Sequence, residues 1–91
     1  MARYRLQVSE ETRRIVEERD KGCVVCGFSA YLELHHIDPY QPQDRVNDPS
    51  NLCMLCRDCH ECMTYLQRRH PSIYYRVVVP YLRRRIGVEA A

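Results

Sequence analysis

This chain contains six cysteines and four histidines, and their spacing can support metal chemistry. Structural zinc sites take four ligands and accept thiolate readily, and each Cys-x-x-Cys turn can supply two sulfur atoms. Cys23 and Cys26 form one such turn. The other turn can be placed in three overlapping ways, because four further cysteines follow one another at the same spacing: Cys53, Cys56, Cys59 and Cys62.

The predicted secondary structure favours Cys56 and Cys59 as the second pair. These two residues lie where a predicted strand turns into a predicted helix, which mirrors the knuckle formed by the first pair. Cys53 falls inside the apolar strand and is expected to be a small buried side chain. Cys62 lies further along the helix and is expected to be a free thiol. Redox use of these thiols is the alternative to zinc binding.

The segment between the two cysteine pairs is longer than a zinc site needs. Twenty-nine residues separate Cys26 from Cys56, whereas roughly 15–20 separate the pairs of an ordinary zinc ribbon. The longer segment contains polar side chains that can do chemistry: His35, His36, Asp38 and Asn51. A purely structural zinc module has no need of them, so this segment indicates a second function beside the zinc.

A strand, a loop, a second strand and a helix are predicted in this order around these residues. Residues 31–37 alternate as a strand, which puts two sets of side chains on opposite faces: Leu32, Leu34 and His36 on one, and Glu33, His35 and Ile37 on the other. Prolines and polar residues predict a loop at 39–50, and residues 52–55 predict a second strand that pairs with the first. A helix follows from about residue 57 to residue 70.

Helices are predicted on both sides of this core. Ser9 is a suitable N-cap for a helix over about 9–21, which Gly22 would end, while residues 1–8 predict a short strand or an arm. In the arginine-rich tail at 71–88, helical spacing competes with the strand preference of residues 77–79 and with Pro80, and we favour a kinked helix. The length predicts one domain over 1–91, of the α+β class.

The order of these motifs resembles the HNH endonuclease family. The resemblance covers residues 21–66 and rests on one run of motifs: Cys23-x-x-Cys26, Leu34-His35-His36-Ile37-x-Pro39 and Asn51-Leu52-x-x-Leu55-Cys56-x-x-Cys59-His60. It implies a ββα-metal (His-Me) finger that zinc stabilises and that N- and C-terminal helices flank. It also implies a single HNH domain with the activity of a metal-dependent DNA endonuclease, which nicks with low sequence specificity.

The resemblance also implies a role for each residue of the site. His36 corresponds to the general base that takes a proton from the attacking water. His35 and His60 correspond to the ligands of a divalent metal, which can be Mg²⁺, Mn²⁺, Ni²⁺ or Zn²⁺. Asn51 corresponds to the residue that holds the loop and orients the base. The zinc and the catalytic metal would be coupled, because Cys59 and His60 are neighbours.

Several of these roles have an alternative. His35 can be the base with His36 on the metal, and Asp38 can join the site although its place before a proline favours a turn cap. Glu33 shares a strand face with His35 and can support it through a hydrogen bond. Asn51 can serve simple turn chemistry instead.

Basic residues are distributed unevenly along the chain. Residues 1–56 hold seven Lys/Arg and nine Asp/Glu, whereas residues 57–91 hold seven arginines and three acids. Because arginine suits bidentate phosphate contacts, six arginines are candidate DNA contacts: Arg57, Arg68, Arg69, Arg83, Arg84 and Arg85. A solvated helix face is the alternative. The seven tyrosines are expected to pack the small core.

The expected partner is DNA, and no association with a membrane is expected. A homodimer is one option, because one finger cuts one strand. No apolar leader opens the sequence, so we expect an intracellular, cytoplasmic protein of bacterial or phage origin. The competing function is a non-catalytic zinc module that binds nucleic acid or protein. It would explain the cysteines and arginines but leave four residues without a purpose: His35, His36, Asn51 and His60.

Overall fold

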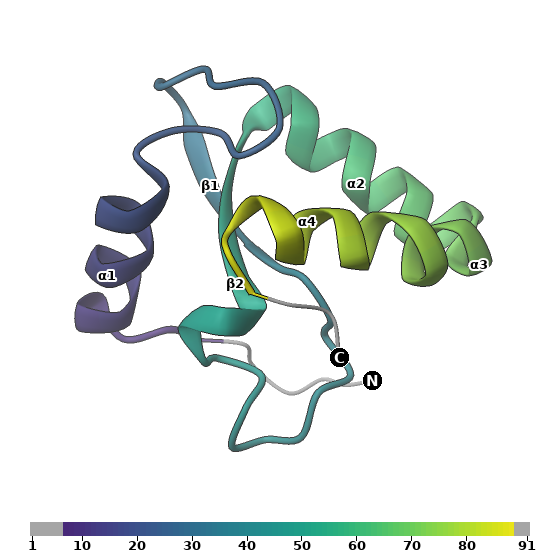
Figure 1. The fold of residues 1–91 in the computed structure, drawn as a ribbon, viewed down its shortest axis with the longest axis horizontal. Helices are drawn as coiled ribbons and strands as arrows, with labels where there is room; N and C mark the ends of the chain where they lie inside the picture. The colour runs from purple at the N-terminus through teal and green to yellow at the C-terminus, as the bar shows by residue number, and fades with distance from the viewer. Residues whose placement is uncertain (1–6, 89–91) are drawn as a thin grey trace.

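A two-stranded antiparallel sheet lies at the centre of the protein, with helices against both faces (Figure 1). The computed structural model describes residues 7–88, so most of the strand or arm predicted at 1–8 lies outside the described residues. Strand β1 spans Leu32–His36 and strand β2 spans Leu52–Cys56, and His35 pairs with Cys53. The predicted order of strand, loop, strand and helix is therefore confirmed.

The two faces of the sheet are buried in different clusters. One face packs Leu52 and Met54 against Val16 of helix α1, which spans Glu10–Asp20. The other face packs Cys53 and Leu55 against the C-terminal helices. Because neighbouring side chains of a strand point to opposite faces, adjacent residues of β1 enter different environments.

Helix α1 begins as predicted but ends one residue earlier than expected. The Ser9 hydroxyl oxygen accepts a hydrogen bond from the Thr12 N–H at 3.1 Å, which confirms the N-cap. The prediction that Gly22 ends the helix was wrong, since Lys21 takes the left-handed conformation with φ 60°. Gly22 serves a close approach instead, because a Cβ atom there would lie 3.2 Å from the Gly27 carbonyl oxygen.

A partly buried ion pair joins the end of α1 to the second strand. The Arg19 guanidinium donates to the Asp20 carboxylate and to the carbonyl oxygens of Pro49 and Leu52. The Asp20 side chain is only 2% exposed and also accepts from the Met54 N–H at 2.9 Å. Satisfied hydrogen bonds of this kind offset the cost of burying the two charges, so the pair fixes where α1 sits on the sheet.

The loop between the strands is held by local caps. Asp38 accepts a hydrogen bond from the Tyr40 N–H at 3.0 Å, which confirms the predicted turn cap. Asp48 accepts from the Ser50 N–H and begins a short 3₁₀ turn, η1, over Pro49–Asn51. These caps replace the strand hydrogen bonds that the loop cannot make.

The C-terminal half is helical, with a wide turn in the middle. Helix α2 spans Arg57–Arg69, α3 spans Pro71–Ile73, a π-helical turn η2 spans Tyr74–Val78, and α4 spans Val79–Arg85. The predicted helix is confirmed, with a π-helical turn in it, and the strand alternative at 77–79 is wrong. Pro80 has no N–H and its ring crowds the preceding turn, which accounts for the widening before it. Within residues 7–88, no helix is both long and apolar enough to cross a membrane.

Candidate zinc and active site

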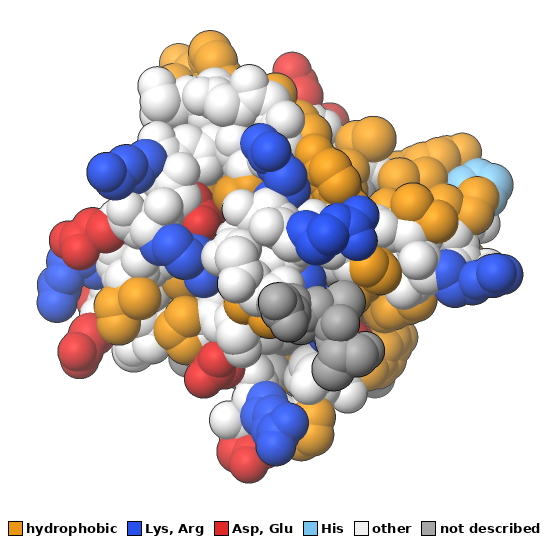
Figure 2. Space-filling view, viewed as in Figure 1, with side chains coloured by type: hydrophobic (Ala, Val, Ile, Leu, Met, Phe, Trp, Pro, Cys, Tyr) orange, Lys and Arg blue, Asp and Glu red, His pale blue; other side chains and the backbone are white. Residues whose placement is uncertain are grey.

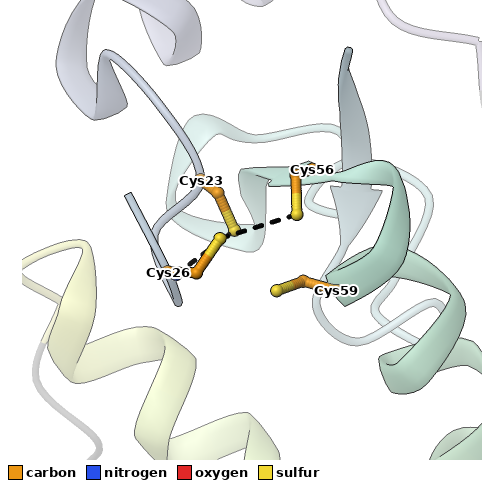
Figure 3. A group of neighbouring side chains, drawn as sticks. All are labelled: Cys23, Cys26, Cys56 and Cys59. Carbon is orange, nitrogen blue, oxygen red and sulfur yellow. Dashed lines mark hydrogen bonds between the residues drawn. The ribbon is translucent and has the colours of Figure 1, made fainter. Parts of the chain in front are cut away.

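Four cysteine sulfurs form a compact cluster between the knuckle that follows α1 and the junction of β2 with α2 (Figure 3). They belong to Cys23, Cys26, Cys56 and Cys59, and lie within 4.8 Å of one another. The Cys26 and Cys56 sulfurs are 3.6 Å apart. Tetrahedral zinc with bonds of about 2.3 Å separates its sulfur ligands by about 3.8 Å, so the cluster fits such an ion.

Two thiols of the cluster have pKa values shifted in opposite directions. Burial acts to raise the pKa of the Cys23 thiol, but hydrogen bonds from backbone N–H groups outweigh it and lower that pKa to about 6. Burial and the neighbouring sulfurs raise the pKa of the Cys59 thiol. A cation bound between the sulfurs favours the thiolate form of all four, which is the state that holds zinc.

The other two cysteines lie apart from this cluster. Cys53 is fully buried in the apolar core, and burial raises the pKa of its thiol to about 12, which keeps it protonated. Cys62 is exposed on α2. Both environments agree with the sequence analysis, which kept these residues out of the zinc site.

His35 and His60 lie together on the α2 side of the sheet. Their ring centroids are 5.2 Å apart in an edge-to-face arrangement. His35 comes from β1 and is 3% exposed, while His60 comes from the first turn of α2. Support of His35 by Glu33, one of the alternatives in the sequence analysis, does not occur, because the Glu33 carboxylate lies 2.6 Å from His60 Nδ1.

Hydrogen bonds fix which nitrogen of each ring carries the proton. The Tyr74 hydroxyl donates to the Ile37 carbonyl oxygen at 2.6 Å, so its oxygen accepts from His35 Nε2 at 2.8 Å. His60 Nδ1 donates to the Glu33 carboxylate. In the neutral rings, His35 Nδ1 and His60 Nε2 are then the nitrogens with a lone pair, and these are the atoms that can bind a cation.

Burial keeps His35 neutral. Desolvation, with smaller effects from the nearby His60 and His36, lowers the pKa of His35 from 6.5 to about 3. A neutral imidazole is the form that binds a metal, so an ion that binds His35 displaces no proton at neutral pH.

The stability of the protein should fall below pH 6.5, and His35 should cause part of that fall. The unfolded chain protonates this ring near 6.5, whereas the folded chain does so near 3. Between these values the unfolded state binds more protons, so stability rises with pH. The contribution of His35 is fully present above 6.5 and decreases toward acid by at most about 1.4 kcal/mol per pH unit.

Urea unfolding at about pH 7.5 and about pH 5.5 measures this contribution when the protein is compared with His35→Gln. Acid also weakens zinc binding, but both proteins share that effect and it cancels in the comparison. We expect the loss of stability between the two pH values to be about 1 kcal/mol smaller in the variant. Equal losses would show that His35 is not held neutral by the fold.

His36 points to the other face of the sheet, where an asparagine holds it. Asn47 Nδ2 donates to the Gln7 carbonyl oxygen at 2.7 Å, which turns Asn47 Oδ1 toward His36. His36 Nε2 lies 2.7 Å from Oδ1 and must be the donor. The lone pair is therefore on His36 Nδ1, the nitrogen that can take a proton. Sequence reasoning missed Asn47, because nothing but its residue type distinguishes it within the loop.

Asn51 ties together the two ends of the loop. Its side chain is buried, accepts from the Asp38 N–H at 3.0 Å, and donates to the carbonyl oxygens of Asp38 and Val46 at 2.9 Å each. Asn51 is not hydrogen-bonded to His36, but it fixes the backbone close to both His36 and Asn47. Its hydrogen bonds reach well beyond the turn in which it lies.

The structure separates the arginines that the sequence analysis grouped together. Arg68 and Arg69 line the same surface hollow as His60, with Tyr65 and Thr64. Arg83 lines a different hollow, and Arg85 donates to the Val24 carbonyl oxygen at 2.7 Å. Figure 2 shows acidic and basic side chains interspersed over α1, whereas basic side chains over the C-terminal helices lie among hydrophobic ones.

The tyrosines also divide between core and surface. Tyr74 is fully buried, which agrees with the expected role in packing. Tyr31, Tyr40 and Tyr65 are exposed, so the prediction that all the tyrosines pack the core was wrong. Sequence reasoning missed the second role of Tyr74, since its hydrogen bond spans 39 residues.

A two-stranded sheet and a following helix, with paired histidines beside a four-cysteine cluster, define a small α+β fold of the ββα-metal class. The family model of the HNH endonuclease matches residues 23–65. The resemblance seen in the sequence is confirmed. No curated protein and no solved structure matched the chain.

Proposed function

We propose that this protein is a metal-dependent DNA endonuclease that hydrolyses phosphodiester bonds and nicks duplex DNA with low sequence specificity. The observation that carries the proposal is the arrangement of His35 and His60. Their rings lie 5.2 Å apart, and each ring is held by a hydrogen bond that leaves one nitrogen free. A zinc module without catalysis has no use for this pair.

The donor set fits a divalent ion. Two imidazoles that bind one ion at about 2.1 Å place their ring centroids roughly 5 Å apart. Imidazole nitrogen suits zinc, nickel and manganese, while magnesium favours oxygen ligands, so the site is permissive. An ion held by His35 and His60 would supply Lewis acidity that stabilises charge on the leaving 3′ oxygen.

His36 supplies the general base in this proposal. Its Nδ1 takes the proton of the attacking water, because Nε2 already carries one and donates it to Asn47. The Asn47 oxygen also stabilises the imidazolium that forms. His36 and His35 face opposite sides of β1, which has β2 on one edge only within the described residues. DNA along the open edge can therefore reach both rings.

Arg68 and Arg69 are the arginines best placed for DNA contacts. They line the hollow that also contains His60, so a phosphate bound there lies next to the candidate metal ligands. Contacts of this kind position the backbone and read no bases, which agrees with low sequence specificity. One site cuts one strand, and a homodimer that cuts both strands stays a prediction.

A plasmid assay tests the proposal. Supercoiled plasmid is incubated with the protein and Mn²⁺, Mg²⁺ or Ni²⁺, with EDTA as the control. We expect conversion to the nicked circle with at least one metal and none with EDTA. Plasmid that binds the protein but stays supercoiled with every metal would favour the non-catalytic zinc module.

A further inference from the structure

Tyr74 lies outside the segment that matches the family but touches its site. It is the first residue of the π-helical turn η2 and is fully buried. Its hydroxyl lies between His35 Nε2, at 2.8 Å, and the Ile37 carbonyl oxygen, at 2.6 Å. The matched segment ends at residue 65, so the C-terminal helices bring this hydroxyl to β1.

Tyr74 constrains His35 in two ways, through its hydroxyl and through its ring. A phenol has one proton, and the Ile37 carbonyl oxygen can only accept, so the Tyr74 oxygen is left to accept from His35. This places the proton of His35 on Nε2 and the lone pair on Nδ1. The edge-to-face contact of the two rings, with centroids 6.2 Å apart, also limits rotation of the imidazole.

Neighbouring side chains hold Tyr74 in place. The neighbouring Tyr75 ring packs edge-to-face on Tyr74 at 5.0 Å, and its hydroxyl accepts from Gln67 of α2 at 3.4 Å. Burial raises the pKa of Tyr74, so its hydroxyl keeps its proton. Helix α2, which carries His60, therefore also supports the residue that orients His35.

We propose that Tyr74 is a positioning residue that fixes His35 as an Nδ1 ligand for a divalent cation, so that the C-terminal helices complete the metal site of the HNH segment. This inference rests on the proposed function. Glu33 orients His60 in a similar way, because its carboxylate accepts a hydrogen bond from His60 Nδ1. The two supports differ, because the side chain of Glu33 is 46% exposed whereas Tyr74 is buried.

Removing the hydroxyl should weaken metal binding without loss of the fold. Tyr74→Phe keeps the buried ring but leaves His35 free to take the other tautomer, with the proton on Nδ1. Loss of a hydrogen bond that orients a metal ligand typically weakens affinity about 10- to 100-fold. Tyr75→Phe is the matched control, since it removes a neighbouring hydroxyl that accepts from Gln67 and does not contact His35 among the described residues.

Titration calorimetry of the zinc-loaded protein with Ni²⁺ measures this affinity. Elemental analysis before and after the titration checks that the zinc content has not changed. We expect the parent protein to bind one Ni²⁺ and His35→Ala to lose that binding. Tyr74→Phe should bind about 10- to 100-fold more weakly and Tyr75→Phe like the parent. Parent-like affinity in Tyr74→Phe would overturn the inference and leave the proposed function intact. A parent protein that binds no Ni²⁺ would also overturn the inference, whereas the proposed function is decided separately by the plasmid assay with all three metals.

The tautomer of His35 gives a second test that needs no variant. Nitrogen-15 chemical shifts of the imidazole distinguish the two neutral forms. We expect the proton on Nε2 in the metal-free histidine site, with the zinc site loaded. A proton on Nδ1 would overturn the inference even if Tyr74→Phe did not fold.

Discussion

Cys59→Ser should unfold this protein, whereas Cys62→Ser should leave it folded. Cys59 is one of the four clustered sulfurs, and Cys62 is an exposed thiol less than one turn further along the same helix. Structural zinc supplies roughly 10–16 kcal/mol of apparent binding free energy in small domains. The total stability of a domain is only about 5–15 kcal/mol, so loss of the zinc exceeds what the small core can offset.

Circular dichroism and zinc content measure the outcome for both variants. We expect Cys59→Ser to lose its helical signal and its zinc together, and Cys62→Ser to keep both. A chelator that removes zinc from the parent protein should have the same effect as the first substitution. A native spectrum from zinc-free Cys59→Ser would contradict this prediction and show that the apolar core suffices for folding.

His36→Ala should slow plasmid nicking by about 100- to 10,000-fold, which is the range that a general base contributes. DNA binding and zinc content should stay unchanged, because His36 contacts neither the cysteine cluster nor the hollow that contains Arg68 and Arg69. The physical reason is that His36 Nδ1 is the nitrogen available to take a proton from water, while Asn47 holds the ring through Nε2.

His70→Ala is the matched control for this substitution. His70 is the fourth histidine, and it is exposed at the end of α2. Rates of nicking under saturating protein separate a defect in chemistry from a defect in DNA binding. If His36→Ala nicked as fast as His70→Ala, the base would have to be another residue, and His35 would be the first alternative to examine.

Much of the site could be predicted from short-range patterns. Two Cys-x-x-Cys turns fix the sulfurs in pairs, since each turn closes locally around one ion. Alternation along β1 sends His35 and His36 to opposite faces whatever the rest of the chain does. The N-cap at Ser9 and the turn cap at Asp38 are also local, because each bonds a backbone N–H within three residues.

The partners of the histidines could not be predicted in this way. Glu33 bonds His60 across 27 residues, and Tyr74 bonds His35 across 39. Asn47 reaches His36 from the loop only because Gln7 holds its amide in one orientation. None of these contacts follows a period or a motif, so the residue types alone gave no reason to prefer them.

The amino-acid sequence alone predicts the pairs of cysteines, the faces of the strand and the match of residues 23–65 to the HNH endonuclease model. These properties depend on spacing along the chain, which sterics and ligand geometry translate directly into local structure. The packed structure was needed to establish which nitrogen of each histidine is free and which arginines lie beside His60. Those outcomes depend on how helices and loops from distant segments pack around β1, and packing of that kind leaves no local signal.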